Sequence, residues 1–536
     1  MTSQRNRIRH YLPIVGLVVA TAGLEACLGD QRVDSNSGQE RKIVLIAGAK
    51  SHGPTVHEYG KTVRLLKVML DRAENVSGIS TEAFPHGWPE DAAVLDDADL
   101  VVVVSDGQDG DLYSPAPFQA SEDRVRQMER LVDRGGGFMT LHFSTFAPDS
   151  LGDQVLEWVG GYFDWQDESG SRNWYSAIQT LDTSVDLLAP EHPISRGLPA
   201  SFRLEDEYYY NLRFKPDDSR LQPILRVPEL MGEREHGGVV AWAVERVDGG
   251  RGFGTSTGHF FRNWENAEYR TLILNAIVWA SGAEVPPDGV ASRFYTNREV
   301  SRALYGASRN ALILTGNHHP AHPWRETTPI LKSILEADGA VHVDVSHNIE
   351  DLHHYDLRDY DFLLLNYANW EDPAGISEAA KESFIEYLTD GGGLIVLHFA
   401  NGAFHFSLPQ AGDSDWPEYR KIVRRVWDHT SDSGHDPYGS FRVEPTAIHH
   451  PITDGIQAFE TSDELYFNQK GDEPIEPLLT ASSLTTGRDE PIAWAYTYGE
   501  GRVFQTVLGH DAGSLSAPAV ATLLRQAGSW VAGVAP

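Results

Sequence analysis

The chain carries one long pattern twice, and this internal repeat constrains its fold more than any other feature. The pattern consists of five short blocks that recur in the same order and at nearly the same spacing. The first block, Gly-Gly-Gly-x-x-x-Leu-His-Phe, starts at Gly135 and again at Gly391. The other blocks are His-Pro-Ile, Asp-Glu-x-Tyr, Ala-Trp-Ala and a Gly-Arg that leads to Gly-His; they start at His192 and His450, Asp206 and Asp463, Ala241 and Ala493, and Gly250 and Gly501. This agreement indicates two tandem copies of one folding unit.

The length of the chain fits this interpretation. It has 536 residues, whereas a single domain usually has about 100–250 residues. The repeated blocks predict a first domain at residues 42–283 and a second at residues 309–536. A stretch that contains Pro, Gly and Ser, residues 284–308, is the predicted linker.

Each unit alternates short apolar runs with amphipathic stretches, which is typical of an α/β domain whose mostly parallel sheet is covered by helices on both faces. The expected strands are 43–47, 100–105 and 138–141 in the first copy, and 311–315, 341–345, 362–366 and 394–397 in the second. The expected helices are 58–73, 121–133, 327–337 and 376–389. The triple glycines fit a helix C-cap followed by a tight turn that needs positive φ.

The first residues are typical of an export signal rather than of a folded domain. A basic segment with Arg5, Arg7 and Arg9 precedes an apolar run at 11–23, and Leu-Glu-Ala-Cys follows at 24–27. This resembles a bacterial lipoprotein signal, which implies cleavage of residues 1–26, lipid attachment to Cys27 and a flexible tether at 27–41. The alternative is an ordinary signal or a short membrane helix with a chance cysteine, although the apolar run is too short to span a bilayer comfortably. We therefore expect a lipid-anchored protein of the cell envelope, attached in a Gram-negative host to the outer membrane and facing the periplasm or cell surface.

The composition excludes several classes of function. The chain has 44 Lys and Arg against 77 Asp and Glu, a formal net charge of −33. Such a charge repels phosphate backbones, so nucleic acid is not an expected partner. Cys27 is the only cysteine, which leaves the mature domains without disulfides, Cys-rich zinc sites or thiol nucleophiles.

Histidines and glutamates at matching places in the two copies carry the candidate chemistry. His142 and His398 directly follow a predicted buried strand, at the carboxyl edge of the sheet where ligands bind in open α/β folds. The alternative is a core histidine whose two nitrogens are satisfied by backbone groups. The shared polar set is His142, His192, Glu207 and His259 in the first copy, and His398, His450, Glu464 and His510 in the second.

Further histidines follow the first strand of each copy, namely His52 and His57, and His318, His319 and His322. Neutral imidazoles beside a carboxylate perform acid–base catalysis, or hold a divalent metal such as zinc with an open position, and the spacing leaves both possibilities open. His192 and His450 each precede a proline and are expected in turns. The predicted catalytic residues are His142, Glu207, His259, His398, Glu464 and His510, and the predicted metal ligands are His52, His57, His318 and His322.

The ordered blocks resemble the trehalose-utilisation (ThuA-like) family, whose domains are similar in fold to the flavodoxin-like class I glutamine amidotransferases. The resemblance covers nearly all of both units and implies a role in carbohydrate catabolism. The chain departs from the amidotransferases because neither copy has a cysteine at the strand-to-helix elbow, which excludes glutamine hydrolysis by a thiolate. Ser144 offers a hydroxyl in the first copy only, since the second has Ala400 there.

Our hypothesis is an exported enzyme that acts on a small carbohydrate, a sugar or keto-sugar, by acid–base or metal-assisted hydrolysis, elimination or isomerisation. The alternative is a non-catalytic carbohydrate-binding or scaffold lipoprotein with a degenerate amidotransferase-like fold. Catalysis requires the two histidines and the glutamate of each predicted catalytic set to cluster within about 10 Å. Aromatic faces suit sugar rings, although core packing explains most tryptophans equally well; the candidates are Trp158, Trp165, Trp174, Trp242, Trp264, Trp416, Trp427 and Trp494.

Overall fold

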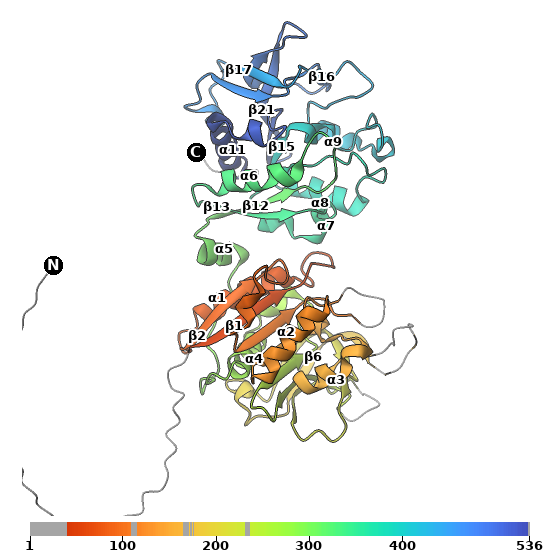
Figure 1. Ribbon diagram of the computed structural model, residues 1–536, viewed down its shortest axis with the longest axis vertical. Coiled ribbons are helices and arrows are strands. Elements are labelled where there is room, and N and C mark those ends of the chain that lie inside the picture. The colour runs from red at the N-terminus through yellow and green to blue at the C-terminus, as the bar shows by residue number, and fades with distance from the viewer. Residues whose placement is uncertain are drawn as a thin grey trace, which may run out of the picture. The chain divides into compact units, whose positions relative to one another are not determined.

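The computed structural model of the protein describes residues 40–108, 115–164, 171, 174, 176–230 and 236–533. Residues Glu40–Pro536 form one compact unit (Figure 1). The predicted signal segment at 1–26, Cys27 and nearly all of the tether at 27–41 lie outside the described residues, so these stay predictions. In the part of the chain that the structure describes, no helix is both long enough and apolar enough to cross a membrane.

Each repeat is built around one nine-stranded sheet, and the two sheets have the same strand order. The strands of the first sheet are, in spatial order, β2 (Ile79–Phe84), β1 (Arg41–Ala47), β3 (Leu100–Val104), β4 (Gly137–Leu141), β11 (Arg251–Thr255), β10 (Val239–Glu245), β9 (Leu221–Arg226), β6 (Ala177–Leu187) and β7 (Ser201–Tyr210). Those of the second are β13 (Val341–Ser346), β12 (Arg309–Leu314), β14 (Phe362–Leu365), β15 (Gly393–Leu397), β22 (Gly501–Thr506), β21 (Asp489–Tyr498), β20 (Pro477–Ser482), β17 (Gly439–Pro445) and β18 (Phe459–Asp463).

The two halves of each sheet differ in direction. In the first repeat, β2, β1, β3, β4 and β11 pair in parallel, whereas β10, β9, β6 and β7 continue the sheet with antiparallel pairs. The second repeat follows the same plan. Two short antiparallel pairs complete the described strands: β5 (Gly161–Tyr162) with β8 (Arg213–Phe214), and β16 (Gly434–His435) with β19 (Tyr466–Phe467).

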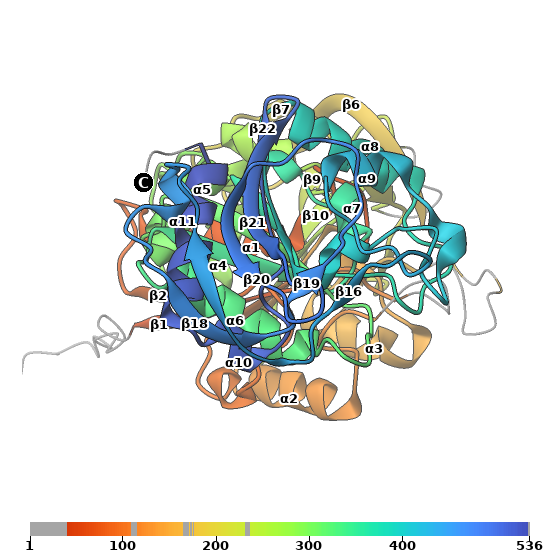
Figure 2. The ribbon, with the colours of Figure 1, turned by 90° about the horizontal axis from the view of Figure 1, so that it is seen from above.

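Helices cover both faces of each sheet. They are α1 (Tyr59–Asp71), α2 (Glu122–Asp133), α3 (Asp149–Trp158), α4 (Ala267–Ala280), α5 (Asn297–Tyr305), α6 (Trp324–Glu336), α7 (Asp351–His354), α8 (Glu378–Thr389), α9 (Pro417–Ile422), α10 (Ala512–Leu515) and α11 (Pro518–Val531). In the second repeat, α6 and α11 lie on one side of the central strands and α8 and α9 on the other (Figure 2).

The alternation of side chains along the buried strands explains this layering. On β1, Ile43, Leu45 and Ala47 pack into the core under α1 and α4, whereas Val44 and Ile46 pack into the core under α2. Successive residues of a strand point to opposite faces, so a strand that is apolar throughout needs cover on both sides. The run Ile-Val-Leu-Ile-Ala therefore requires the three-layer arrangement that the structure has.

The expected α/β architecture of two tandem flavodoxin-like domains is confirmed. Each expected strand and helix is present, with ends that differ by a few residues. Of the first triple glycine, Gly135 has φ 83° after α2, and Gly137 needs space, because a Cβ there would lie 2.2 Å from the carbonyl oxygen of Ala280. The predicted linker contains α5, whose first turn is closed by a capping box of Thr296 and Glu299.

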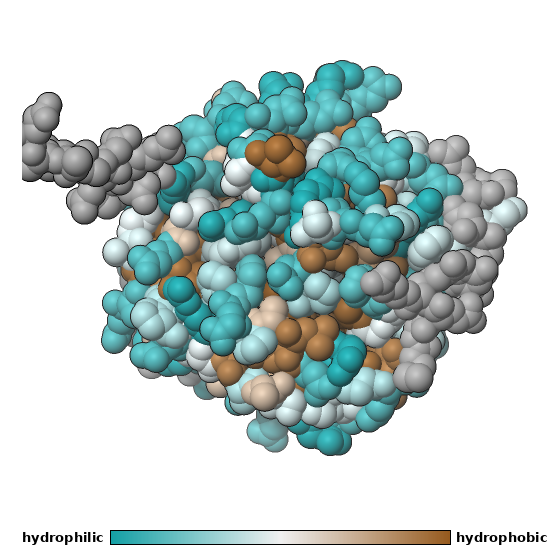
Figure 3. All heavy atoms as spheres, turned by 90° about the horizontal axis from the view of Figure 1, so that it is seen from below, coloured by the Kyte–Doolittle hydropathy of each residue, from teal (hydrophilic) through white to brown (hydrophobic). Residues whose placement is uncertain are grey.

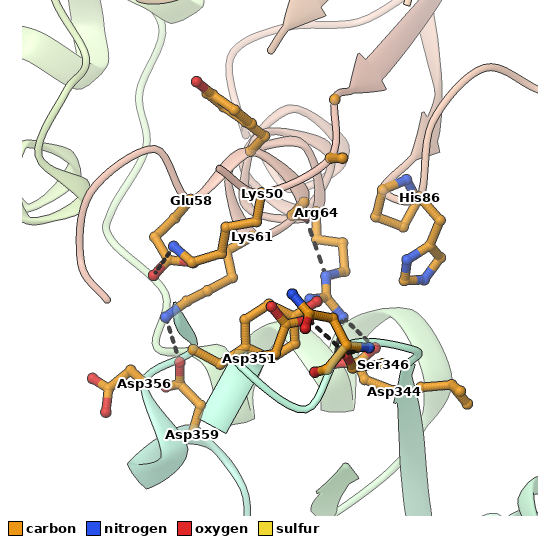
Figure 4. Close-up of a pocket in the computed structure, with 18 of the residues that line it drawn as sticks. Lys50, Glu58, Lys61, Arg64, His86, Asp344, Ser346, Asp351, Asp356 and Asp359 are labelled. Carbon is orange, nitrogen blue, oxygen red and sulfur yellow. Dashed lines mark hydrogen bonds and ion pairs between the residues drawn. The ribbon is translucent and has the colours of Figure 1, made fainter. Parts of the chain in front are cut away.

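Basic side chains of α1 pair with carboxylates of the second repeat (Figure 4). Arg64 Nη1 lies 3.2 Å from Asp344 Oδ1, and Lys61 pairs with Asp359. Burial opposes ionisation of Asp344, but the Arg64 guanidinium holds the pKa of this carboxyl well below its usual range. These four side chains line a cavity of about 500 Å³. Lys61 and Arg64 are therefore already paired with carboxylates inside this cavity.

The exposed surface is mainly hydrophilic. Hydrophilic residues predominate on the face in Figure 3, and hydrophobic residues form separate areas between them. Most large apolar side chains of the described residues are buried in the cores instead.

Candidate metal centres in the two repeats

The central histidine of each repeat occupies a strained backbone position at the end of a parallel strand. His142 follows β4 with φ 53°, and His398 follows β15 with φ 45°. Positive φ is uncommon for residues other than glycine and is frequently found at functional sites. Each histidine is buried and opens a short 3-10 helix, η2 (His142–Thr145) or η6 (His398–Gly402). The sharp turn directs each imidazole to the carboxyl edge of the sheet, as the sequence predicted.

Three imidazoles converge at this edge in the first repeat. His57 Nε2 lies 3.1 Å from His142 Nε2 and 2.9 Å from His259 Nδ1. The distance from His142 Nε2 to His259 Nδ1 is 3.3 Å. Glu207 Oε1 lies 3.8 Å from His142 Nε2 and 3.4 Å from His259 Nδ1. These four residues each place one potential ligand atom here, and the four atoms all lie within 4.8 Å of one another.

The second repeat builds the same cluster from His322, His398, Glu464 and His510. Glu464 Oε2 lies 3.8 Å from His398 Nε2 and 3.2 Å from His510 Nδ1. The three imidazole centroids are 4.9–5.4 Å apart, against 4.7–5.2 Å in the first repeat. The predicted convergence of the histidines and the glutamate is confirmed in both repeats, whereas their catalytic role stays a prediction.

A buried aspartate aligns the glutamate with the third histidine. Asp206 precedes Glu207 on β7, and its carboxylate accepts hydrogen bonds from the backbone N–H groups of Glu207, Gly258 and His259 at 2.7–3.0 Å. Burial raises the pKa of Asp206 to about 7, against the effect of these donors. Asp463 accepts the equivalent three bonds from Glu464, Gly509 and His510 at 2.8–3.3 Å. The Asp-Glu pair of the sequence block thus fixes the strand that carries the glutamate to the loop that carries the histidine.

The hydrogen bonds around His142 and His398 fix their tautomers. A backbone carbonyl only accepts, so the Nδ1–H of His142 donates to Ser256 O at 2.7 Å, and that of His398 donates to Val507 O at 2.6 Å. Each Nε2 is therefore left with a lone pair that points into the cluster. This excludes a core histidine with both nitrogens satisfied by the backbone.

His57 has a further support that acts through two side chains. Its Nδ1 lies 2.8 Å from Tyr59 Oη, and Tyr59 Oη donates to the Asp106 carboxylate. Since that carboxylate takes the phenol proton, Tyr59 Oη accepts from His57 Nδ1–H, and His57 Nε2 keeps its lone pair. The lone pairs of His57 and His142 are then 3.1 Å apart, and both point into the cluster.

The spacing and the chemistry of these groups fit a divalent transition metal. Zinc binds imidazole nitrogen at about 2.0–2.1 Å, so its ligand atoms lie about 3 Å from one another. The measured nitrogen separations in the first repeat are 2.9–3.3 Å. Three imidazoles and one carboxylate are also ligands that zinc prefers.

The electrostatic surroundings keep the imidazoles available as ligands. Burial lowers the pKa of His57 to about 2, of His259 to about 4 and of His398 to about 3. Burial also places the pKa values of His142 and His322 well below the usual range. His510 differs, because the Glu464 carboxylate raises its pKa although burial acts in the opposite direction. Neutral imidazole is the form that binds metal.

The tyrosine of the Asp-Glu-x-Tyr block adds a phenol to each cluster. Tyr209 Oη lies 2.8 Å from His142 Nε2, and Tyr466 Oη lies 2.7 Å from His398 Nε2. Burial raises both phenol pKa values well above the usual range. Each phenol therefore stays protonated at neutral pH and can donate a hydrogen bond or a proton within the cluster.

The first-strand histidines divide into members of the clusters and their neighbours. His57 and His322 belong to the four-residue clusters, whereas His52 joins a separate group with His57 and Asp106. The structure corrects the prediction for His318, which is exposed and lies outside these groups. Adjacent residues of an extended loop point to opposite sides, and here it is His319 whose ring lies 4.3 Å from that of His322.

Other sequence candidates have structural roles. The imidazoles of His192 and His450 accept from the backbone N–H groups of Ile194 and Ile452 and so cap short 3-10 helices, as expected for turn residues. Ser144 Oγ is buried and accepts a hydrogen bond from Leu141 N. Its hydroxyl can donate to the backbone carbonyl of Val103 or of Leu141, each 2.8 Å away. Of the candidate tryptophans, Trp427 borders a cavity, Trp174 is half-buried and Trp165 lies outside the described residues; those buried in the cores are Trp158, Trp242, Trp264, Trp416 and Trp494.

Sequence reasoning missed four contributors to the clusters. Asp206 and Tyr209 lie within a recognised block, and their recurrence as Asp463 and Tyr466 was the signal that could have found them. The pair of Tyr59 with Asp106 had no such signal, because the second copy has Trp324 at the position of Tyr59. A residue that is present in only one copy cannot be detected through the repeat.

The comparison with known protein families agrees with the tandem architecture. The family described as ThuA, trehalose utilisation, matches residues 46–280 and again residues 310–531. A ThuA-like protein from Parabacteroides merdae is 24% identical over 42% of this chain and 91% of its own, with a TM-score of 0.37. One from Bacteroides uniformis is 21% identical over 42% of this chain and 91% of its own, with a TM-score of 0.34. A cytoplasmic protein from Salmonella typhimurium is 15% identical over 41% of this chain and 99% of its own, with a TM-score of 0.32. The search of curated proteins found no match.

Proposed function

The chain belongs to the ThuA, or trehalose-utilisation, family, and on that premise we propose that each repeat binds one divalent metal ion and that the protein acts on a small carbohydrate. The observation that carries the proposal is the convergence of three imidazole nitrogens and one carboxylate in both repeats. The two copies of the repeat thus keep the same three histidines and one glutamate at matching places. Zinc is the metal that best fits this ligand set.

The chemistry of the cluster suits a sugar or keto-sugar substrate. A divalent metal ion bound by imidazoles polarises a carbonyl or hydroxyl oxygen and lowers the pKa of water. The glutamate is half-buried beside the histidines and is placed to bind the metal or to accept a proton. The buried phenol of Tyr209 or Tyr466 is placed to donate one. Hydrolysis, elimination and isomerisation of sugars all need such a combination of acid and base.

Metal analysis of the purified full chain tests the proposal. After incubation with zinc and removal of the excess, mass spectrometry of the metal content should find two equivalents per chain. His142→Ala and His398→Ala should each remove one equivalent, and the double variant should remove both. His318→Ala is the matched control, because this histidine adjoins the second cluster in sequence but lies exposed outside it; it should keep both equivalents.

Two results would contradict the metal proposal. The first is a wild-type protein that keeps only trace metal, and the second is a double variant that still binds two equivalents. Activity is then assayed on trehalose and on its keto-sugar oxidation products, before and after chelation and with metal restored. Turnover that is unchanged by complete metal removal would exclude a metal-assisted reaction.

A non-catalytic carbohydrate-binding or scaffold role is the second candidate. It is favoured by the absence of an amidotransferase nucleophile, since a histidine occupies the elbow of both repeats. This candidate predicts sugar binding that is independent of metal and an absence of turnover on every sugar tested. The chelation experiment therefore distinguishes the two candidates.

The lipid anchor belongs to the same proposal. Attachment through Cys27 would hold the protein at a membrane of the cell envelope, with each buried methylene contributing about 0.8 kcal/mol to membrane affinity. Leu28 follows the cysteine, and we expect no retention at the inner membrane. Cys27→Ala should move the protein into the soluble fraction after cell lysis, and a variant that still sediments fully with membranes would exclude lipid anchoring.

A further inference from the structure

A cavity adjoins the candidate metal centre of the second repeat. Its volume is about 160 Å³, which is less than the about 300–1,000 Å³ of pockets for drug-sized ligands. His322, Glu464 and Tyr466 of the cluster form part of its wall, and the half-buried Trp370 and Trp427 form another part. The cavity is thus large enough for one small ring and opens directly onto the groups that we propose bind the metal.

One glycine keeps this cavity open. Gly402 follows His398 by four residues and lines the cavity, and a Cβ there would meet only Trp427 Cβ, at 3.5 Å. The position four residues after His142 holds Phe146 instead. Phe146 is buried, stacks on Phe163 at 3.8 Å between ring centroids and contacts Tyr209 at 5.1 Å. The described part of the first repeat therefore has an aromatic ring where the second repeat has open space.

The register of the strands shows that Phe163 and Trp427 are equivalent. Tyr162 pairs with Arg213, four residues after Tyr209, and Val426 pairs with Lys470, four residues after Tyr466. The residues that follow these pairs are Phe163 and Trp427. Phe163 is completely buried under Phe146, whereas the larger ring of Trp427 borders the cavity. The change from Phe146 to Gly402 thus exposes an aromatic face.

Polar groups surround the aromatic walls. Asn401 is fully buried and lines the cavity; its Nδ2 donates to Gln469 Oε1 at 2.7 Å, while its Oδ1 has no hydrogen-bond partner among the described residues. His435 Nδ1 lies 3.6 Å from Glu464 Oε1, and His429 lies between the two tryptophans, with ring centroids 5.5 and 5.8 Å away. A free carbonyl oxygen beside apolar faces suits a ligand that has hydroxyl groups around an apolar ring face.

We propose that the second repeat binds a single sugar ring in this cavity, stacked on Trp427 with a hydroxyl group donating to Asn401, and that Phe146 blocks the equivalent position in the first repeat. The inference rests on the proposed carbohydrate function and adds the size of the ligand and the repeat that takes it. A disaccharide would place one ring in the cavity and leave the other outside, so the second repeat would act on the end of a sugar chain.

Binding of glucose and trehalose to the full chain tests this assignment. Saturation-transfer NMR and titration calorimetry should detect both sugars in the wild-type protein. Trp427→Ala and Gly402→Phe should each weaken binding by about tenfold or more, because one removes the stacking face and the other fills the cavity. Trp427→Phe should retain most of the binding. Trp88→Ala is the control, since Trp88 lies in the first repeat outside both clusters.

The outcomes are separable from those of the metal proposal when metal content is measured in the same samples. Loss of sugar binding with two metal equivalents retained supports the ring assignment, and circular dichroism confirms that Gly402→Phe is folded. Should that variant unfold, Trp427→Ala and Trp427→Phe still decide the question. The assignment is wrong if wild-type protein binds neither sugar, or if Trp427→Ala binds both as tightly as the wild type. Wild-type protein that binds both sugars but keeps only trace metal after incubation with zinc would overturn the metal proposal alone.

Discussion

The two repeats hold the same four candidate ligands but surround them differently. In the first repeat, Tyr59 and Asp106 support His57 through hydrogen bonds, and Phe146 fills the space next to Phe163 and Tyr209. In the second, Trp324 stands at the position of Tyr59, and His322 Nδ1 is buried with no hydrogen-bond partner among the described residues. The space next to Gly402 and Trp427 is an open cavity. The shared blocks thus set the geometry of the centre, whereas unshared residues set its rigidity and its access.

The largest expected effect follows from the difference in access. If the second repeat is the one that takes the sugar, Glu464→Gln should lower kcat/KM by about 10²–10⁴-fold, the usual contribution of a group that transfers a proton. Glu207→Gln in the first repeat should change it by less than about threefold. The measurement is the rate of sugar turnover at low substrate concentration for both variants. Equal losses in the two variants would show that both centres are catalytic and would break the comparison.

The second prediction concerns a feature that the repeats share. Asp206→Ala and Asp463→Ala should each destabilise their repeat by about 3 kcal/mol, because three buried N–H groups lose their acceptor. For a domain of this size that corresponds to a fall of about 6–12 °C in Tm. Calorimetry of both variants, with Asp182→Ala at an exposed position of β6 as the control, provides the test. A fall in only one repeat would mean that the two aspartates have different roles.

The third prediction uses the support that only the first repeat has. Tyr59→Phe should weaken metal binding at that repeat by about 10–100-fold, because groups that orient a ligating histidine contribute that much to affinity. Trp324→Phe should leave the affinity of the second repeat within about threefold, since the indole Nε1 of Trp324 has no hydrogen-bond partner among the described residues. Competition with a chromophoric zinc chelator measures both affinities. If Tyr59→Phe has no effect, the hydrogen bond to His57 does not support a metal ligand.

The same division explains how much the sequence could predict. Buried strands such as 43–47 and the histidines that follow them were predictable, because an apolar run fixes a central strand and the duplication marks His142 and His398. The antiparallel half of each sheet was not, since strands such as β6 combine exposed and buried residues without a strict alternation. The choice of His319 over His318 as the residue that faces the cavity depends on the path of one loop. The effects of Phe146 and Gly402 on access to the clusters could not be predicted, because they depend on neighbours that are distant in the sequence.

The smallest expected effect is a pH dependence that should be alike in both repeats. Burial lowers the pKa of His192 to about 4 from about 6.5 in an unfolded chain, and it also lowers the pKa of His450. The unfolded state therefore binds the proton first, so the free energy of unfolding is highest above pH 6.5 and falls as the pH decreases towards 4. The structural reason is that protonated Nδ1 can no longer accept from the N–H of Ile194 or Ile452. Because the imidazole of His192 is partly exposed, solvent screening reduces the expected loss to about 1 kcal/mol.

His192→Asn keeps a side-chain cap but cannot titrate, so its stability should decrease less than that of the wild type between pH 6.5 and 4, and His450→Asn should behave in the same way. Chemical denaturation at a series of pH values measures the difference, and parallel curves for wild type and His192→Asn would show that this cap does not respond to acid.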